Sequence, residues 1–187
     1  DRARLVTAQQ QINKAANRIV IREIRDFFFD DKEGSIEAKF DFAEQIRQIN
    51  RMTAHYGKPP LVIIDSLHEI PVDIKGLRST DLKQKIDHIM LNLRFMCDQT
   101  GATFLLISHQ SRSGQKEGGL QSFLGSASIE YTVDMALTVS IPKANEGKLS
   151  NETDRELTVS KNRYGPRPKA LLDFNGKYMD FTFTDML

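Results

Sequence analysis

The chain has 187 residues, with 26 Lys and Arg against 25 Asp and Glu and a formal net charge of +1. This length is sufficient for a hydrophobic core, and no linker-like stretch divides the chain, so we predict a single domain over residues 1–187. The balanced charge neither supports nor excludes a nucleic-acid partner. No apolar run approaches the roughly 18 residues of a membrane span, and no leader-like N-terminus occurs. The default expectation is therefore a cytoplasmic protein without a membrane partner.

The sequence contains one cysteine, Cys97, so no disulfide can form within the chain. Cys97 lies among apolar residues at helical spacing, where a buried thiol is expected rather than a reactive one. The chain also begins at Asp1 rather than at Met. We interpret this start as a sign that the sequence is a truncated part of a longer protein.

The first elements predicted along the chain are helices and one strand. Residues 2–16 are compatible with an exposed helix. Further on, an apolar cluster predicts a strand that ends near Phe29. Apolar residues at three- and four-residue spacing from Phe40 to Met52 predict an amphipathic helix. The Gly- and Pro-containing residues 56–60 should end that helix, because Gly favours a helix end and Pro cannot continue one.

Four consecutive aliphatic residues, 61–64, end abruptly on Asp65. Such a run without polar alternation predicts a strand buried on both faces, which is typical of a parallel sheet covered by helices. Ligands bind at the carboxyl end of such strands, so Asp65 is well placed to hold a Mg²⁺ ion that carries nucleotide phosphates. A simpler interpretation is that Asp65 caps the following turn or helix. These residues alone leave both interpretations open.

A helix and a second apolar strand follow Asp65. Apolar residues on one face predict a helix from about residue 81 to residue 98, and residues 102–107 predict a strand that ends on Ser108 and His109. Two apolar strands joined by a long helix form a βαβ unit with parallel strands. We therefore expect Asp65 and His109 to emerge at the same edge of the sheet.

The remaining part of the chain, from residue 111 onward, is predicted to contain a loop, a short helix and several strands. A Gly-rich loop over residues 111–125 should project from the ligand edge. A short helix over 128–134 and a strand over 135–141 should follow, and then an exposed, hairpin-like connection over 142–154. Three antiparallel strands are expected at the end of the chain, near residues 156–160, 169–174 and 178–183. The Asn175-Gly176 pair predicts a hairpin turn between the last two.

The order of these motifs resembles the ATPase core of the DnaB-type replicative helicases in the RecA superfamily. The resemblance rests on Asp65, the Ser108-His109 pair, the Gly-rich loop, the segment 125–130 and the Lys161-Asn162-Arg163-Tyr164-Gly165-Pro166 stretch. It covers roughly residues 27–183. It implies an α/β, RecA-like P-loop NTPase core, with a parallel sheet flanked by helices and antiparallel C-terminal strands appended. The implied activity is ATP hydrolysis coupled to translocation on single-stranded DNA and to its unwinding.

The resemblance also assigns roles to particular residues. Asp65, with Ser66 beside it, matches the Walker B strand end that holds Mg²⁺ through its waters and contacts ATP. His109 matches the sensor of the γ-phosphate; the alternative is a histidine that is hydrogen-bonded at a strand end. Lys161 and Arg163 match a finger that reaches the triphosphate of the neighbouring subunit in trans, which implies a homo-oligomer, usually a hexameric ring. The alternative for this pair is an exposed basic strand.

The Gly-rich loop would face the centre of such a ring. Arg112 and Lys116, with Gly118 and Gly119, would then track a single strand of DNA. The alternative is a surface excursion without a ligand. Phe123-Leu124-Gly125 stands where these helicases carry an Arg-Glu pair that touches DNA, which weakens the DNA assignment specifically.

One motif of the family does not occur in these 187 residues. No Gly-x-x-x-x-Gly-Lys-Ser/Thr phosphate-binding loop (Walker A) is found, and the catalytic carboxylate of the family lies upstream of the matched region. The sequence is therefore either part of a longer ATPase or a RecA-like module that assembles with other proteins without catalysis. The RadA/Sms-type DNA-repair ATPases are a second alternative, because they share an Ile-Asp-Ser, a sensor His and a Lys-Asn-Arg-Phe-Gly stretch. A signalling phosphotransferase of the KaiC kind is a third, weaker one.

Overall fold

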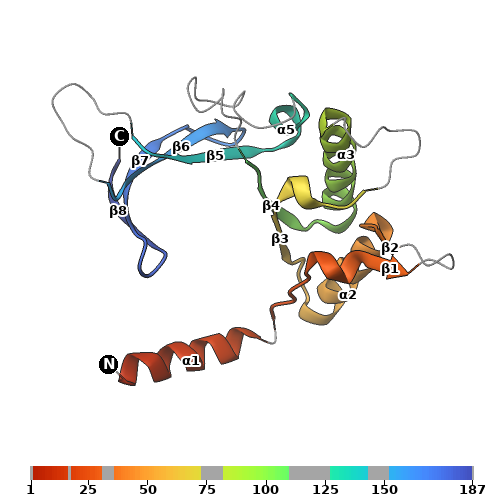
Figure 1. Cartoon of the computed structure of the whole chain (residues 1–187), viewed down its shortest axis with the longest axis horizontal. Coiled ribbons are helices and arrows are strands. Elements are labelled where there is room, and N and C mark those ends of the chain that lie inside the picture. The colour runs from red at the N-terminus through yellow and green to blue at the C-terminus, as the bar shows by residue number, and fades with distance from the viewer. Residues whose placement is uncertain are drawn as a thin grey trace. The chain divides into compact units, whose positions relative to one another are not determined.

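A computed structural model describes residues 2–16, 18–30, 36–72, 82–109, 127–142 and 152–186 (Figure 1). The chain forms two compact units. The smaller unit comprises Asp1–Phe40 with Glu69–Asp73, and the larger one comprises Asp41–His68 with Ile74–Leu187. No helix in the described part of the chain is long and apolar enough to span a bilayer.

The smaller unit begins with the helix α1 (Arg2–Ala16), as the sequence predicts. A 3₁₀ turn, η1 (Ile24–Phe27), leads into a short antiparallel pair, β1 (Phe28–Asp30) and β2 (Ile36–Ala38). The strand predicted near Phe29 is therefore confirmed. The rings of Phe27 and Phe40 pack with their centroids 5.2 Å apart beside this pair.

Two helices supply the core of the larger unit. The helix α2 (Phe42–Tyr56) begins at Asp41, whose carboxylate accepts a hydrogen bond from the Glu44 N–H, and ends at Gly57 with φ 74°. The helix α3 (Leu82–Thr100) ends in the same way at Gly101, with φ 66°. A left-handed residue suits Gly because it has no Cβ to clash. Five of the twelve buried apolar residues in the described part of the chain form one stripe of α3, namely Ile86, Ile89, Met90, Leu93 and Met96.

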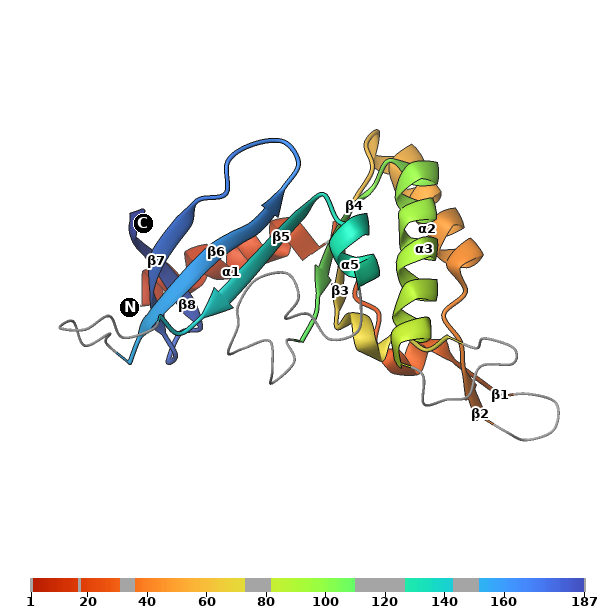
Figure 2. The same ribbon diagram turned by 90° about the horizontal axis from the view of Figure 1, so that it is seen from above.

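The strands on either side of α3 pair in parallel. β3 (Leu61–Asp65) and β4 (Thr103–Ile107) are in register from Leu61 opposite Thr103 to Asp65 opposite Ile107. The predicted βαβ unit is therefore confirmed. Figures 1 and 2 show α2 and α3 together on one side of this strand pair.

The expectation that the strand over residues 61–64, which is β3, is buried on both faces is wrong. Alternate side chains are half-buried, whereas Leu61 and Ile63 are 58% and 59% exposed, and Leu105 on β4 is 47% exposed. The reason is that α2 and α3 lie on the same side of the pair, so the described residues cover one face only. The uninterrupted apolar run therefore does not reflect burial by the described residues.

The C-terminal part is an antiparallel sheet in the order β5-β6-β7-β8. It follows a short helix, α5 (Ala127–Thr132), and consists of β5 (Met135–Ser140), β6 (Asp154–Asn162), β7 (Lys169–Asn175) and β8 (Asp180–Met186). The predicted helix, the strands and the turn after Asn175 are confirmed. Residues 143–151 of the connection expected over residues 142–154 lie outside the described residues.

Candidate functional site

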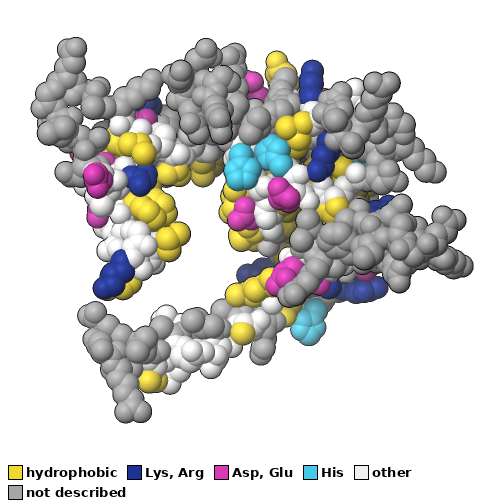
Figure 3. All heavy atoms as spheres, viewed as in Figure 1, with side chains coloured by type: hydrophobic (Ala, Val, Ile, Leu, Met, Phe, Trp, Pro, Cys, Tyr) yellow, Lys and Arg dark blue, Asp and Glu magenta, His cyan; other side chains and the backbone are white. Residues whose placement is uncertain are grey.

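The carboxyl ends of β3 and β4 bring the predicted nucleotide residues together. Asp65 is the last residue of β3 and pairs with Ile107, the last residue of β4. His109 comes two residues after Ile107 and so lies just beyond the same end of the strand pair. The ring of His109 lies beside that of His68, with centroids 5.8 Å apart and planes tilted by 32°. Histidine side chains adjoin one another on the face drawn in Figure 3. The expectation that Asp65 and His109 share one edge is therefore confirmed.

Two side chains at this edge, one exposed and one buried, carry oxygen atoms without a partner in the described residues. The Asp65 side chain is exposed, and no hydrogen bond or ion pair engages its carboxylate within the described residues. Ser66 is only 5% exposed, yet its Oγ has no hydrogen-bond partner there. Buried polar atoms without partners are rare in proteins, and Mg²⁺ prefers oxygen ligands together with several waters. The exposed Asp65 carboxylate therefore fits a hydrated Mg²⁺ ion that binds the protein through few ligands.

The described residues contain no group of three or more His, Cys, Asp or Glu side chains arranged to hold a metal. A dedicated cage of protein ligands is therefore not formed by this part of the chain.

A short turn connects this edge to α3. η2 (Leu67–Glu69) follows Ser66, and Leu67 at its start is completely buried. The Lys85 ammonium of α3 donates a hydrogen bond of 2.7 Å to the His68 carbonyl. Sequence reasoning missed His68 and Lys85. The proximity of His68 to Asp65 in sequence was the one available signal, since nothing in the pattern pairs Lys85 with a carbonyl 17 residues away.

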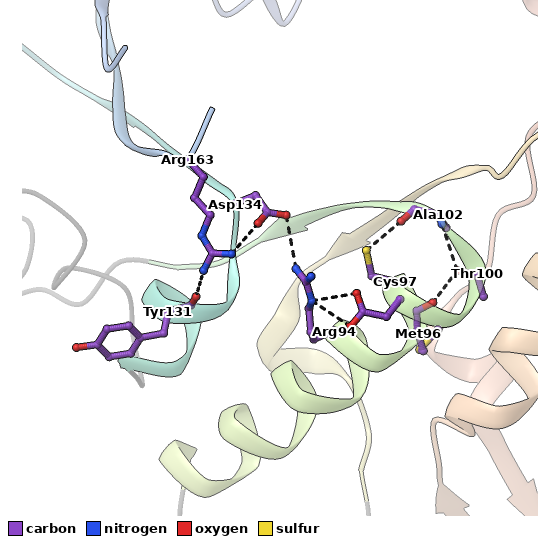
Figure 4. Close-up of polar contacts among 9 residues, drawn as sticks. Arg94, Met96, Cys97, Thr100, Ala102, Tyr131, Asp134 and Arg163 are labelled. Atoms are coloured by element: carbon purple, nitrogen blue, oxygen red, sulfur yellow. Dashed lines mark hydrogen bonds and ion pairs between the residues drawn. The ribbon is translucent and has the colours of Figure 1, made fainter. Parts of the chain in front are cut away.

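The other predicted pair, Lys161 and Arg163, lies at the end of β6 and turns toward α5. The Lys161 ammonium donates to the Glu130 carbonyl, and one guanidinium nitrogen of Arg163, Nη2, donates to the Tyr131 carbonyl. The other, Nη1, donates to Asp134 Oδ1 at 3.0 Å (Figure 4). Both cations therefore lie at the C-terminal end of α5, where carbonyl groups lack helical partners and favour positive charge.

A second arginine shares the carboxylate that holds Arg163. Arg94 of α3 lies 3.7 Å from Asp134 and 3.2 Å from Asp98, measured between nitrogen and oxygen (Figure 4). The Asp98 carboxylate raises the pKa of Arg94, and Asp134 adds to the effect. Burial lowers the pKa of the Lys161 ammonium, and the charge of Arg163 acts in the same direction. Sequence reasoning missed Arg94 and Asp134, because 40 residues separate them.

The predicted DNA contacts Arg112, Lys116, Gly118 and Gly119 lie outside the described residues. Cys97 is half-buried rather than fully buried, and its thiol lies 3.4 Å from the Ala102 carbonyl. This contact helps to close the turn between α3 and β4.

The fold and the strand-end site define a RecA-like α/β ATPase core. The sequence model of the DnaB-like helicase C-terminal domain matches residues 2–183. The chain therefore belongs to the DnaB-like helicase C-terminal domain family, a family of ATPases of the replicative-helicase type. No curated protein sequence matches this chain.

Solved structures share this fold. One, the structure of a DnaB-like replicative helicase and its interactions with primase, is 18% identical with a TM-score of 0.65, over 80% of this chain. Another, an ATPase domain, is 18% identical with a TM-score of 0.64, over 94% of this chain. The present chain spans 37% of the first of these chains and 65% of the second.

Proposed function

We propose that this chain is part of an ATP-driven motor that translocates on single-stranded DNA and unwinds duplex DNA. The observation that carries the proposal is the shared edge of β3 and β4, where Asp65, Ser66 and His109 meet. Membership of the DnaB-like family supports an ATPase of this type. The finer assignments below are proposals for this chain.

At the strand edge each residue has a separate task. Asp65 would hold hydrated Mg²⁺, and that ion would supply positive charge to offset the charge of the phosphate groups. Ser66, the next residue along the chain, is the second residue proposed to bind the nucleotide. His109 is placed to donate a hydrogen bond to the γ-phosphate and so to distinguish ATP from ADP.

Lys161 and Arg163 serve a different triphosphate, that of the neighbouring subunit. A guanidinium is planar and always charged, so it suits the charge that spreads over the transferring phosphoryl group. Such a contact in trans needs a homo-oligomer with head-to-tail interfaces, and a closed hexameric ring is the expected form. In that ring Arg112 and Lys116, with Gly118 and Gly119, would contact the phosphates of single-stranded DNA.

A second candidate follows from one feature of the sequence. These 187 residues contain no Gly-x-x-x-x-Gly-Lys-Ser/Thr loop, which is the principal holder of a triphosphate. A RecA-like module that assembles with other proteins without hydrolysis is therefore the alternative. Within the catalytic class, a repair ATPase of the RadA/Sms type is the competing assignment. Stimulation by single-stranded DNA together with unwinding of a forked duplex separates the motor from both.

The trans assignment is tested with the Arg163→Ala variant of the full-length protein, measured as ATP turnover with single-stranded DNA. Loss of an arginine finger typically reduces kcat by about 10³-fold or more, so only residual turnover should remain while nucleotide binding survives. Arg155→Ala is the matched control, because Arg155 lies at the other end of the same strand and contacts the Phe174 ring. The control should turn over normally.

Mixing two inactive variants distinguishes trans from cis action. Arg163→Ala subunits keep Asp65, and Asp65→Asn subunits keep Arg163, so a mixed ring contains some sites with both residues intact. Turnover should reappear on mixing. Normal turnover of Arg163→Ala alone, or no recovery in mixtures that co-assemble, would contradict the finger assignment.

A further inference from the structure

The Arg163 side chain is held by contacts within its own chain. The Arg163 backbone N–H donates to the Asp134 carbonyl at 3.0 Å, and the guanidinium contacts Asp134 Oδ1 and the Tyr131 carbonyl. Three hydrogen bonds therefore hold one residue against the turn between α5 and β5. An arginine side chain has several rotatable bonds, so contacts of this kind select one of many rotamers.

The same contacts leave Arg163 able to bind an anion. A guanidinium has five N–H donors, and the two side-chain bonds to Tyr131 and Asp134 use one donor each. The side chain is 45% exposed, so the remaining donors are accessible. Asp134 thus orients the group without covering it.

Arg94 limits the electrostatic cost of placing a carboxylate beside the finger. A lone Asp134 would neutralise Arg163 and reduce its attraction for phosphate. Because Arg94 lies 3.7 Å from the other oxygen of Asp134, the carboxylate is shared between two cations. Asp98, 3.2 Å from Arg94, in turn fixes Arg94 along α3. The result is an alternating row in the order Arg163, Asp134, Arg94, Asp98.

We propose that Asp134 and Arg94 are positioning residues for Arg163, which hold its guanidinium in the orientation needed by the neighbouring subunit's triphosphate. The inference rests on the proposed trans role of Arg163. Preorganised groups stabilise a transition state because they do not have to reorient during the reaction. Asp134 therefore acts on the rate of the chemical step rather than on nucleotide affinity.

The test measures kcat and KM for ATP in the full-length protein with single-stranded DNA. Small misplacements of catalytic groups cost up to about 100-fold in rate, so Asp134→Ala should lower kcat roughly 10- to 100-fold and leave KM unchanged. Asp134→Glu keeps a carboxylate within reach and should recover most of the rate. In the Arg163→Ala background, Asp134→Ala should cause no further loss, because the residue acts only through Arg163.

The matched control removes an ion pair of equal length elsewhere in the same sheet. The Lys169 ammonium lies 3.0 Å from the Glu156 carboxylate, as Arg163 does from Asp134. Lys169→Ala should leave kcat and KM unchanged. If Asp134→Ala does not fold, Arg94→Ala provides the second variant, with an intermediate loss of kcat expected and an unchanged KM.

The outcomes separate this inference from the proposed function. An inactive Arg163→Ala with a fully active Asp134→Ala overturns the positioning role and leaves the finger assignment intact. A fully active Arg163→Ala overturns both. A loss in Asp134→Ala that Glu does not recover, or that appears equally in KM, indicates a purely structural role and also overturns the inference.

Discussion

The two candidate sites of the larger unit differ in how far the chain itself satisfies their polar groups. At the ends of β3 and β4, the Asp65 carboxylate and the Ser66 hydroxyl have no hydrogen-bond partner within the described residues. At the turn between α5 and β5, Arg163 and Asp134 bond to each other and to neighbouring groups.

The difference separates two kinds of site. Groups without partners in the chain contribute no internal hydrogen bond to stability, so their removal should affect binding and catalysis more than stability. Groups that are bonded internally are already oriented, so removal of one changes the geometry of the others. The following variants test this contrast, from the largest expected effect to the smallest.

Asp65→Asn should have the largest effect on activity and almost none on the fold. Loss of the charge that holds hydrated Mg²⁺ should lower ATP turnover by roughly 100-fold or more. The midpoint of thermal unfolding should stay the same, because the carboxylate has no bond to lose in the described residues. Asp173→Asn, at an exposed position on β7, is the control for both measurements. A marked fall in the unfolding midpoint of Asp65→Asn would show that the open edge is in fact structural.

Ser128→Ala, in α5 near the second candidate site, should lower the stability of the protein rather than its activity. The Ser128 hydroxyl donates to the Asp87 carboxylate and so joins α5 to α3. Removing this bond should lower the free energy of unfolding by about 1 kcal/mol, measured by urea denaturation. Ser140→Ala, an exposed serine on β5, should change it by less than about 0.5 kcal/mol. Equal values for the two variants would argue against a structural tie between α5 and α3.

The smallest expected effect is a pH-dependent contribution of the Glu156–Lys169 pair to the free energy of unfolding. The hydrogen bond from Lys169 lowers the pKa of Glu156 below its ordinary 4.5. A depressed pKa in the folded state stabilises the protein above pH 4.5, and this contribution is lost as the pH falls through the folded value. Its size should be about 0.5 kcal/mol, because the pair is partly exposed. Glu156→Gln should weaken the pH dependence of unfolding between neutral pH and pH 3; an unchanged profile would show that the pair contributes nothing.

Much of this architecture follows from local patterns in the sequence. The spacing of Ile86, Ile89 and Leu93 determines which face of α3 is buried, and the parallel pairing of β3 with β4 follows from the length of the helix between them. The shared edge of Asp65 and His109 could therefore be predicted without coordinates.

Other features depend on tertiary contacts that leave no local trace. The exposure of Leu61 and Ile63 could not be predicted, because an apolar run has the same sequence whether one face or both are covered. The bond between Asp134 and Arg163 joins residues 29 apart across two elements. Each looks like an ordinary surface charge, and only the antiparallel register of β5 and β6, which pairs Met135 with Asn162, brings them together.

The helix α3 contacts both regions and connects them mechanically. Lys85, near its first turn, holds the carbonyl of His68 beside the nucleotide edge, and Arg94, nine positions later, holds Asp134. These positions are separated by about 14 Å along the helix axis. Within one subunit, the proposed nucleotide site and the residue proposed to serve the next subunit are therefore both attached to the same helix.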